Sequence, residues 1–280
     1  MDYMSFLSKV VVKITTDRNS SGTGFFYMFV YSEDTSIPVI LTNKHVIEGC
    51  NSINVILSKN DYFSTESKFV EKEEFSLHNL QNRVMNHPNQ DIDLCAIIIT
   101  DMLEELQKYS IEIDISFLKD SNLPKIDDLE NLKFVEEVIM IGYPNGISDT
   151  FNNLPVFRKG ITATHPAINF DGTPHFLIDM TIVPGSSGSP VFLYNSTGYS
   201  TKSGDYIFNG ERLMFLGINK AVFIADNYGE IKEIQAPTKL VSHSKIGINL
   251  GVIISSLEIN EIRKEFDKQL ERLEMNKDEN

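Results

Sequence analysis

The sequence is poor in several features that mark particular classes of protein. It contains two cysteines, Cys50 and Cys95, which are too few for a disulfide framework. No uninterrupted apolar stretch reaches the length of a membrane-spanning helix. The N-terminus lacks the basic start and the long apolar core of a secretory signal. We therefore expect a cytoplasmic protein, outside any membrane, whose two thiols are reduced and lie in the core.

Positive charge is also scarce. The 280 residues include 25 Lys and Arg against 39 Asp and Glu, a formal net charge of −14, and the basic residues form no long run. Nucleic acids and anionic membranes are therefore poor candidate partners. The apolar content of 41% is that of an ordinary globular protein, and the length allows one large or two small domains. The abundance of Asn, Ile and Lys fits a bacterial source.

Short apolar segments with turn signals between them recur through most of the chain, which is typical of all-β proteins. They predict two β-rich halves, 1–110 and 137–255, joined by a connector at 111–136. Residues 102–109 favour a short helix, because their apolar positions follow helical steps. Strands are expected at 10–15, 24–31, 38–42, 53–57, 94–100, 137–141, 156–164, 175–180, 190–194, 213–219 and 246–254.

The end of the chain has a different pattern. Residues 255–258 read Ser-Ser-Leu-Glu, a capping box with serine first and glutamate three positions later. Apolar residues then recur at steps of three and four, at Ile259, Ile262, Phe266, Leu270 and Leu273. This periodicity predicts an amphipathic helix over 256–275. We expect its apolar face to pack on the second β half; a partner-binding helix is the alternative.

A heptapeptide rich in glycine and serine, Pro-Gly-Ser-Ser-Gly-Ser-Pro at 184–190, joins two apolar runs of strand length. A tight turn of this composition can expose a serine hydroxyl and aim that residue's own N–H at a bound carbonyl. An acyl-transfer nucleophile with an oxyanion hole needs both features. The alternative is a Gly/Ser loop with no catalytic role. The choice between the two depends on the other residues of the chain.

Two further residues could activate such a serine. His45 follows a buried-looking strand, which is a firm place for a general base. Asp93 opens an apolar run, where a half-buried carboxylate needs a partner such as an imidazole N–H. Asp91 is a nearby competitor. The order His45, Asp93, Ser187 is that of chymotrypsin-type sites and predicts a site between the two halves.

Five segments in the same order carry a resemblance to a known family. They are Gly22-Thr23-Gly24-Phe25, Thr42-Asn43-Lys44-His45-Val46, Asp93-Leu94-Cys95-Ala96-Ile97, Gly142-Tyr143-Pro144-Asn145-Gly146 and the heptapeptide 184–190. Over residues 9–257 the sequence resembles bacterial trypsin-like serine peptidases of the chymotrypsin superfamily, the group that includes the HtrA proteases. The resemblance implies two six-stranded antiparallel β-barrels and hydrolysis of peptide bonds without metal or cofactor. We expect the C-terminal helix in place of a PDZ module.

The resemblance also implies roles for individual residues. His45 would be the base, Asp93 would orient it, and Ser187 would attack, with the N–H groups of Gly185 and Ser187 forming the oxyanion hole. Two positions depart from secreted trypsins, which carry aspartate in place of Ser186 and glycine in place of Ser189. Without a carboxylate at 186 there is no partner for a cleaved N-terminus, so we expect activity without N-terminal processing.

The resemblance also bears on specificity and on partners. The resemblance places the substrate pocket at Thr181, Asn219, Lys220, Ala221 and Val222. This set favours a neutral or acidic side chain before the scissile bond, although Asp226 could fold back and reverse that preference. The expected partners are a protein or peptide substrate and a regulatory protein, with a role in bacterial defence left open. A protease-like binding module and an esterase with the same triad are the competing functions.

Overall fold

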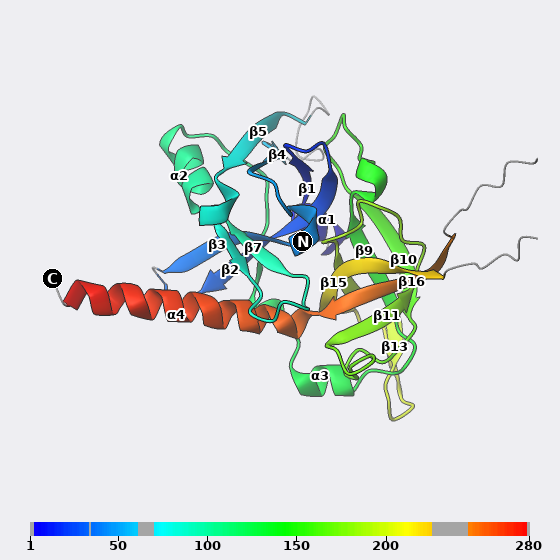
Figure 1. Ribbon diagram of the computed structural model, residues 1–280. Helices are drawn as coiled ribbons and strands as arrows, with labels where there is room; N and C mark the ends of the chain where they lie inside the picture. The colour runs from blue at the N-terminus through cyan, green and yellow to red at the C-terminus, as the bar shows by residue number, and fades with distance from the viewer. Residues whose placement is uncertain (1–2, 34, 61–69, 226–245, 279–280) are drawn as a thin grey trace, which may run out of the picture.

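The computed structural model describes residues 3–33, 35–60, 70–225 and 246–278. Two β units lie side by side, and a long helix at the C-terminus extends away from the second unit (Figure 1). The fold is mostly β and chymotrypsin-like, as the sequence predicts. Within the described part of the chain, no helix combines the length and apolarity needed to cross a bilayer.

The first unit is an eight-stranded, curled sheet with the order β5-β4-β1-β2-β3-β7-β6 and with β8 paired in parallel to β2. All its other pairs are antiparallel. Its strands are β1 (Val11–Thr16), β2 (Ser21–Val30), β3 (Ser36–Thr42), β4 (Ser52–Ser58), β5 (Lys72–His78), β6 (Val84–Asn86), β7 (Cys95–Ile98) and β8 (Leu118–Lys119).

This sheet is open at one corner, whereas the sequence predicted a closed six-stranded barrel. Among the described residues, no strand pairing joins β5 to β6. The side chain of Arg83, the residue before β6, instead bonds the ends of β5 and β7: it donates from Nε to the carbonyl of His78 at 2.8 Å and from Nη1 to the carbonyl of Ile98 at 3.3 Å. β6 has only three residues, and all three of them pair with β7.

The second unit is a closed barrel of six antiparallel strands, as predicted, in the order β10-β11-β16-β15-β12-β9. A two-stranded hairpin, β13 and β14, projects from it. The strands are β9 (Glu137–Gly142), β10 (Val156–Thr162), β11 (His175–Asp179), β12 (Pro190–Asn195), β13 (Gly198–Ser200), β14 (Tyr206–Phe208), β15 (Arg212–Ala225) and β16 (Ile246–Ser255).

The helical elements are short apart from the last one. The α-helices are α1 (Tyr3–Ser8), α2 (Thr100–Lys108), α3 (Ile126–Glu130) and α4 (Ile259–Asp278). The 3-10 turns are η1 (Lys44–Val46), η2 (Leu80–Asn82), η3 (Asp120–Asn122), η4 (Pro144–Gly146) and η5 (Ser256–Glu258). α2 lies where the helical spacing at 102–109 predicted it, and the connector holds β8 and α3.

One apolar core is shared between the two units. Phe25 on β2 meets Phe215 on β15 edge to face, with ring centroids 5.5 Å apart. Phe215 in turn packs on Phe192 at 5.2 Å. Because each of these rings is almost fully buried, the contact removes a large apolar area from water. This shared core fixes the first sheet against the second barrel. Residues at the junction of the two units are therefore held at a fixed distance from one another.

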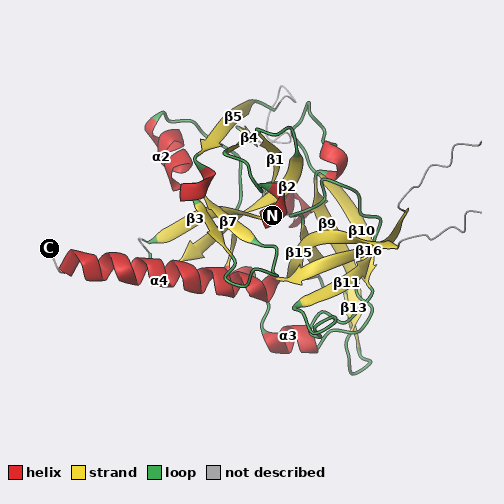
Figure 2. Cartoon of the chain, in the orientation of Figure 1, coloured by secondary structure: helices red, strands yellow, loops and turns green. Residues whose placement is uncertain are grey.

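The C-terminal helix packs differently from what the sequence predicted. α4 begins beside the second barrel but crosses to the first sheet (Figure 2), where Phe266 lies 5.3 Å from the ring of Phe29 on β2. Arg263 donates to the carbonyl of Val30 at 2.8 Å and pairs with Asp120. The expectation that this helix packs on the second β half is therefore wrong for most of its described length.

The predicted capping box does not close either. η5 precedes α4, and the Ser255 hydroxyl accepts a bond from the N–H of Leu257 at 3.4 Å. Glu258 turns away from the helix end, and its Oε2 lies 3.1 Å from Nε2 of His87. The Glu258 carboxylate thus pairs with His87 of the first unit, and not with the backbone at the start of the helix as the local pattern predicted.

Candidate active site

His45 and Asp93 are joined by two hydrogen bonds. η1 follows β3 directly and carries His45, while Asp93 stands two residues before β7, which pairs with β3. Nδ1 of His45 lies 2.5 Å from Oδ2 of Asp93, and the backbone N–H of His45 donates to Oδ1 at 3.1 Å. Of the two acids that the sequence left open, Asp93 is the one that contacts His45. Asp91 is exposed, and its N–H bonds to the Asn89 side chain.

Neighbouring residues hold Asp93 in place and keep it ionised. Asn43, fully buried, donates from Nδ2 to the carbonyl of Asp93 at 2.7 Å. Burial of Asp93 opposes its ionisation, but the hydrogen bonds and charge of His45, with a smaller contribution from Lys220, more than offset it. The pKa of Asp93 is therefore below its ordinary value. The carboxylate remains charged and fixes Nδ1 of the imidazole as a donor, so Nε2 is the nitrogen left to accept a hydrogen bond.

The loop that carries Ser187 depends on two glycines with positive φ. Gly185 and Gly188 both have φ of +83°, where other residues are strained. A Cβ on Gly188 would lie 2.0 Å from the carbonyl oxygen of Thr23. That carbonyl accepts a bond from the Thr42 hydroxyl at 2.8 Å, and the N–H of Thr23 donates to the carbonyl of Ser187 at 2.9 Å. The serine loop of the second barrel thus lies directly on β2 of the first sheet.

Hydrogen bonds also orient the peptide group before Gly185. The carbonyl of Pro184 accepts a bond from the N–H of Asn145 at 2.5 Å. Because C=O and N–H point in opposite directions in a trans peptide, the N–H of Gly185 faces away from Asn145. Within the described structure, neither this N–H nor that of Ser187 donates to a protein acceptor. Two free backbone donors, two residues apart, are what an oxyanion hole requires.

The Ser187 hydroxyl is partly exposed and does not bond His45. It donates to the carbonyl of Lys220 at 3.4 Å, a long and weak contact. Among the described residues, no hydrogen bond links it to the imidazole of His45. Catalytic hydrogen bonds are often long or misaligned without substrate and tighten in the complex, so this spacing is compatible with a nucleophile and base.

The described residues of the predicted pocket have different surroundings. Thr181 is exposed. Asn219 is buried, and its Nδ2 donates to the carbonyl of Ser186 at 2.9 Å, so it supports the serine loop. Lys220 lines a cavity together with His45 and Asp93. The backbones of Ala221 and Val222 pair with β16, while their side chains, like Asp226, lie outside the described parts of the structure.

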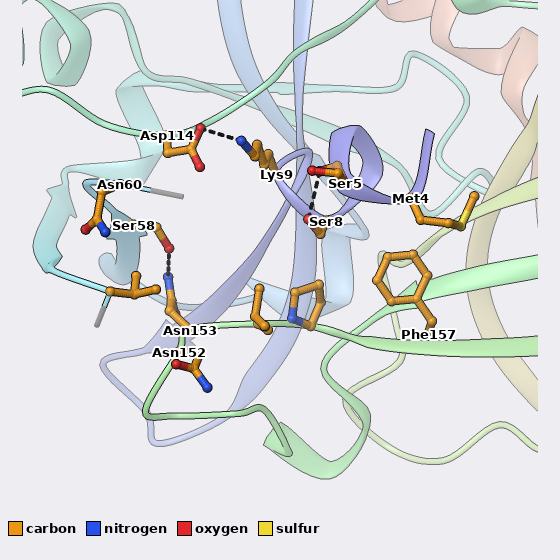
Figure 3. Close-up of a pocket in the computed structure, with 13 residues that line it drawn as sticks. Met4, Ser5, Ser8, Lys9, Ser58, Asn60, Asp114, Asn152, Asn153 and Phe157 are labelled. Atoms are coloured by element: carbon orange, nitrogen blue, oxygen red, sulfur yellow. Dashed lines mark hydrogen bonds and ion pairs between the residues drawn. The ribbon is translucent and has the colours of Figure 1, made fainter. Parts of the chain in front are cut away.

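Two cavities differ in what lines them. The larger, about 1020 Å³, contains His45, Asp93 and Lys220 and is walled by the segments 47–51 and 80–91. A smaller one, about 330 Å³, lies between α1 and the segment 152–155 (Figure 3), beside the Lys9–Asp114 ion pair. None of the predicted catalytic residues lines the smaller cavity. The larger cavity therefore contains the predicted base and its carboxylate, but Ser187 is not among the residues that line it.

Sequence reasoning missed one residue that organises the site. Thr23 accepts a bond at its hydroxyl from the N–H of Tyr143 at 3.0 Å and donates to the carbonyl of Gly185 at 3.1 Å. Its place between Gly22 and Gly24 was the available signal, because a threonine flanked by glycines can approach another backbone closely. The spacing gave no indication of its partner, which is distant in the chain.

Comparisons with known proteins identify a family for most of the chain. The trypsin-like peptidase domain family matches residues 22–199. Rv3671c from M. tuberculosis H37Rv, solved as the inactive form of a serine-to-alanine mutant, is 14% identical with a TM-score of 0.45, over 92% of this chain and 87% of that one. Human heparin binding protein is 9% identical with a TM-score of 0.47, over 94% and 91%. No curated protein matches the sequence.

Proposed function

Because the chain belongs to the family of trypsin-like peptidase domains, we propose that it is a serine endopeptidase with Ser187 as nucleophile, His45 as general base and Asp93 as the residue that orients the base. The observation that carries this proposal is the pair of hydrogen bonds between Asp93 and His45. A carboxylate that uses both oxygens on one histidine fixes the tautomer and the ring direction that proton transfer needs.

The proposed reaction proceeds through an acyl-enzyme. As Oγ of Ser187 bonds the peptide carbonyl carbon, its proton passes to Nε2 of His45. The N–H groups of Gly185 and Ser187 bind the resulting oxyanion. The C–N bond then breaks, and the proton moves from His45 to the leaving amine. Water attacks the ester with His45 again as base, which releases the acid and restores the Ser187 hydroxyl.

Labelling with a fluorophosphonate probe tests the nucleophile. We expect the unmodified chain to react and the Ser187→Ala variant to remain unlabelled. Ser186→Ala is the matched control, because this neighbour is buried and its hydroxyl has no partner within the described structure. An unlabelled chain would indicate a protease-like binding module, whereas labelling without cleavage of a peptide library would indicate an esterase.

We further propose a cytoplasmic protease whose substrate is a protein or peptide and whose activity is restricted by narrow specificity or by a protein partner. Two free cysteines support the reducing compartment. A protease free in the cytoplasm would otherwise damage its host. Capture of new protein N-termini from cells with the active chain, compared with Ser187→Ala, identifies the substrates. Identical N-termini in the two samples would contradict proteolysis in the cell.

A further inference from the structure

The turn η4 packs directly against the backbone of Gly185. A Cβ on Gly185 would lie 2.8 Å from the carbonyl oxygen of Tyr143 and 2.9 Å from the backbone nitrogen of Asn145. The N–H of Asn145 donates to the carbonyl of Pro184 at 2.5 Å, and this bond sets the direction of the peptide group between Pro184 and Gly185. The position of η4 therefore determines where the N–H of Gly185, one of the two proposed oxyanion donors, is directed.

The backbone of η4 adopts an uncommon conformation. Asn145 has φ of 51° and ψ of 27°, and Gly146 has φ of +68°. Asparagine tolerates left-handed angles better than most residues, but such a conformation persists only where surrounding contacts favour it. Within the turn, the N–H of Gly146 donates to the carbonyl of Tyr143 at 2.9 Å. The carbonyl of Gly146 has its partner in the first unit.

Lys13 on β1 is that partner. Its Nζ donates to the carbonyl of Gly146 at 2.8 Å, and among the described residues no other side chain donates to a carbonyl of η4. Lys13 pairs with Thr23 in the β1–β2 ladder, so the two side chains lie on the same face of the first sheet. Thr23 donates to the carbonyl of Gly185 at 3.1 Å. One cross-strand pair thus holds both η4 and the Gly185 backbone.

A second lysine bonds the same loop at a different place. Nζ of Lys72 donates to the carbonyls of Thr150 and Phe151 at 2.7 and 3.4 Å. These residues follow η4 and belong to a turn in which Asp149 accepts bonds from the N–H groups of Phe151 and Asn152. Lys72 is therefore a matched comparison for Lys13, because it makes the same kind of bond to the same loop outside η4.

We propose that Lys13 is a positioning residue of the oxyanion hole, which holds η4 so that the N–H of Gly185 stays directed at the substrate carbonyl. The inference rests on the proposed peptidase function. Without the ammonium group, η4 can move away from Gly185 and release the carbonyl of Pro184. The peptide group can then rotate, because glycine permits several backbone conformations. A rotated peptide presents a carbonyl oxygen where the oxyanion needs a donor.

The first test compares cleavage of an uncharged peptide by Lys13→Met and Lys72→Met. We expect Lys13→Met to lower kcat about tenfold and to leave KM within about twofold, because the Gly185 donor acts on the oxyanion and not on the bound substrate. Lys72→Met should keep kcat within about twofold, and Lys13→Arg, which retains a charged donor, should restore most of the loss. Lys13→Gln replaces the methionine variant if that variant does not fold. Equal losses in Lys13→Met and Lys72→Met would overturn the proposal.

A peptidyl aldehyde tests the oxyanion hole more directly. The Ser187 hydroxyl adds across the aldehyde C=O, and the hemiacetal oxygen that forms occupies the proposed hole. We expect the inhibition constant in Lys13→Met to rise by the same factor by which kcat falls. Binding of the uncharged peptide to Ser187→Ala should change less than about twofold when Lys13→Met is added. Unchanged inhibition by the aldehyde would refute the positioning role.

An NMR readout separates this inference from the proposed function. In the Ser187→Ala background, the amide signal of Gly185 should shift or broaden when Lys13→Met is added and stay in place when Lys72→Met is added. An unmoved Gly185 signal in Lys13→Met would overturn the inference. A moved signal in a chain that a fluorophosphonate probe does not label would contradict the peptidase proposal while supporting the action of Lys13 on this peptide group.

Discussion

The Thr23 hydroxyl donates a hydrogen bond to the carbonyl of Gly185, so the first sheet holds the backbone that precedes the proposed nucleophile. The same hydroxyl accepts from the N–H of Tyr143. One side chain thus links three of the five segments on which the family resemblance depends. The site is divided between the two β units in sequence, and this contact is one reason that it is continuous in space.

Replacing Thr23 with valine removes these hydrogen bonds at nearly constant volume. The buried N–H of Tyr143 loses its partner, which should lower the free energy of unfolding by about 1–3 kcal/mol. The Gly185 peptide also loses its anchor, so we expect kcat to fall by roughly ten- to a hundredfold. Urea unfolding and peptide cleavage measure the two effects. Thr15→Val, exposed on β1, is the control, and equal kcat values in the two variants would contradict this role.

Gly188→Ala should be far more damaging than Gly204→Ala. Both glycines have positive φ, so the backbone strain is similar, about 1–2 kcal/mol. Only at 188 does the new Cβ meet another atom, the Thr23 carbonyl at 2.0 Å; nothing lies within 4 Å at 204. We expect Gly188→Ala to separate the serine loop from β2 and abolish probe labelling, and Gly204→Ala to retain it. Normal labelling of both variants would show that the loop adapts to the clash.

Asp93→Asn and Asp91→Asn form a matched pair two residues apart. The first keeps the shape of the side chain but removes the charge that holds the His45 tautomer, so we expect kcat to fall by about 10⁴-fold. The second changes an exposed side chain and should leave kcat within about twofold, because it contacts no proposed catalytic group. Steady-state kinetics decides; a large loss at 91 with little at 93 would reverse the assignment.

His175 should make stability depend on pH. Burial, with the charge of Lys220, lowers its pKa to about 4 in the folded state, and its Nε2 has no partner within the described residues. The unfolded chain, with an ordinary histidine pKa, binds the proton first as pH falls. Stability is therefore fully present above about pH 6.5 and is lost toward pH 4, by up to about 3 kcal/mol. Urea unfolding from pH 7 to 4 should show a smaller loss in His175→Gln; equal losses would contradict the assignment.

The sequence predicted those parts of the fold that depend on local patterns. The apolar alternation predicted most core strands, and the closed second barrel agrees with them. β5 was missed because its residues are mostly exposed, with only Leu77 buried, so it has no apolar alternation to detect. The packing of α4 on the first sheet was not predicted, because helical periodicity identifies an apolar face but not the element against which that face packs. Glu258 is a second example: the local pattern predicted a helix cap, but its carboxylate pairs with His87, which is distant in the sequence.

In the site, the order of the motifs predicted His45, Asp93 and Ser187 but not the residues that hold them in place. His45 contacts Asp93, as predicted from the need of a half-buried carboxylate for a donor. Strand alternation could not choose between Asp91 and Asp93, and the choice of Asp93 depended on the family resemblance. The resemblance placed Lys220 at the substrate pocket, but it did not predict the bulge in β15 at this residue. Nothing in the sequence of one strand shows that its partner lacks a residue. The catalytic roles themselves stay predictions until the variants are measured.

The order of elements along the chain has a consequence during synthesis. β16 closes the second barrel between β11 and β15, and α4 brings Phe266 back to Phe29 of the first sheet. Both elements follow all three residues of the proposed triad. During synthesis, His45, Asp93 and Ser187 therefore leave the ribosome before β16 and α4 do. The three residues of the proposed triad are thus synthesised before β16 and α4, and the second barrel can close around Ser187 only after β16 has emerged.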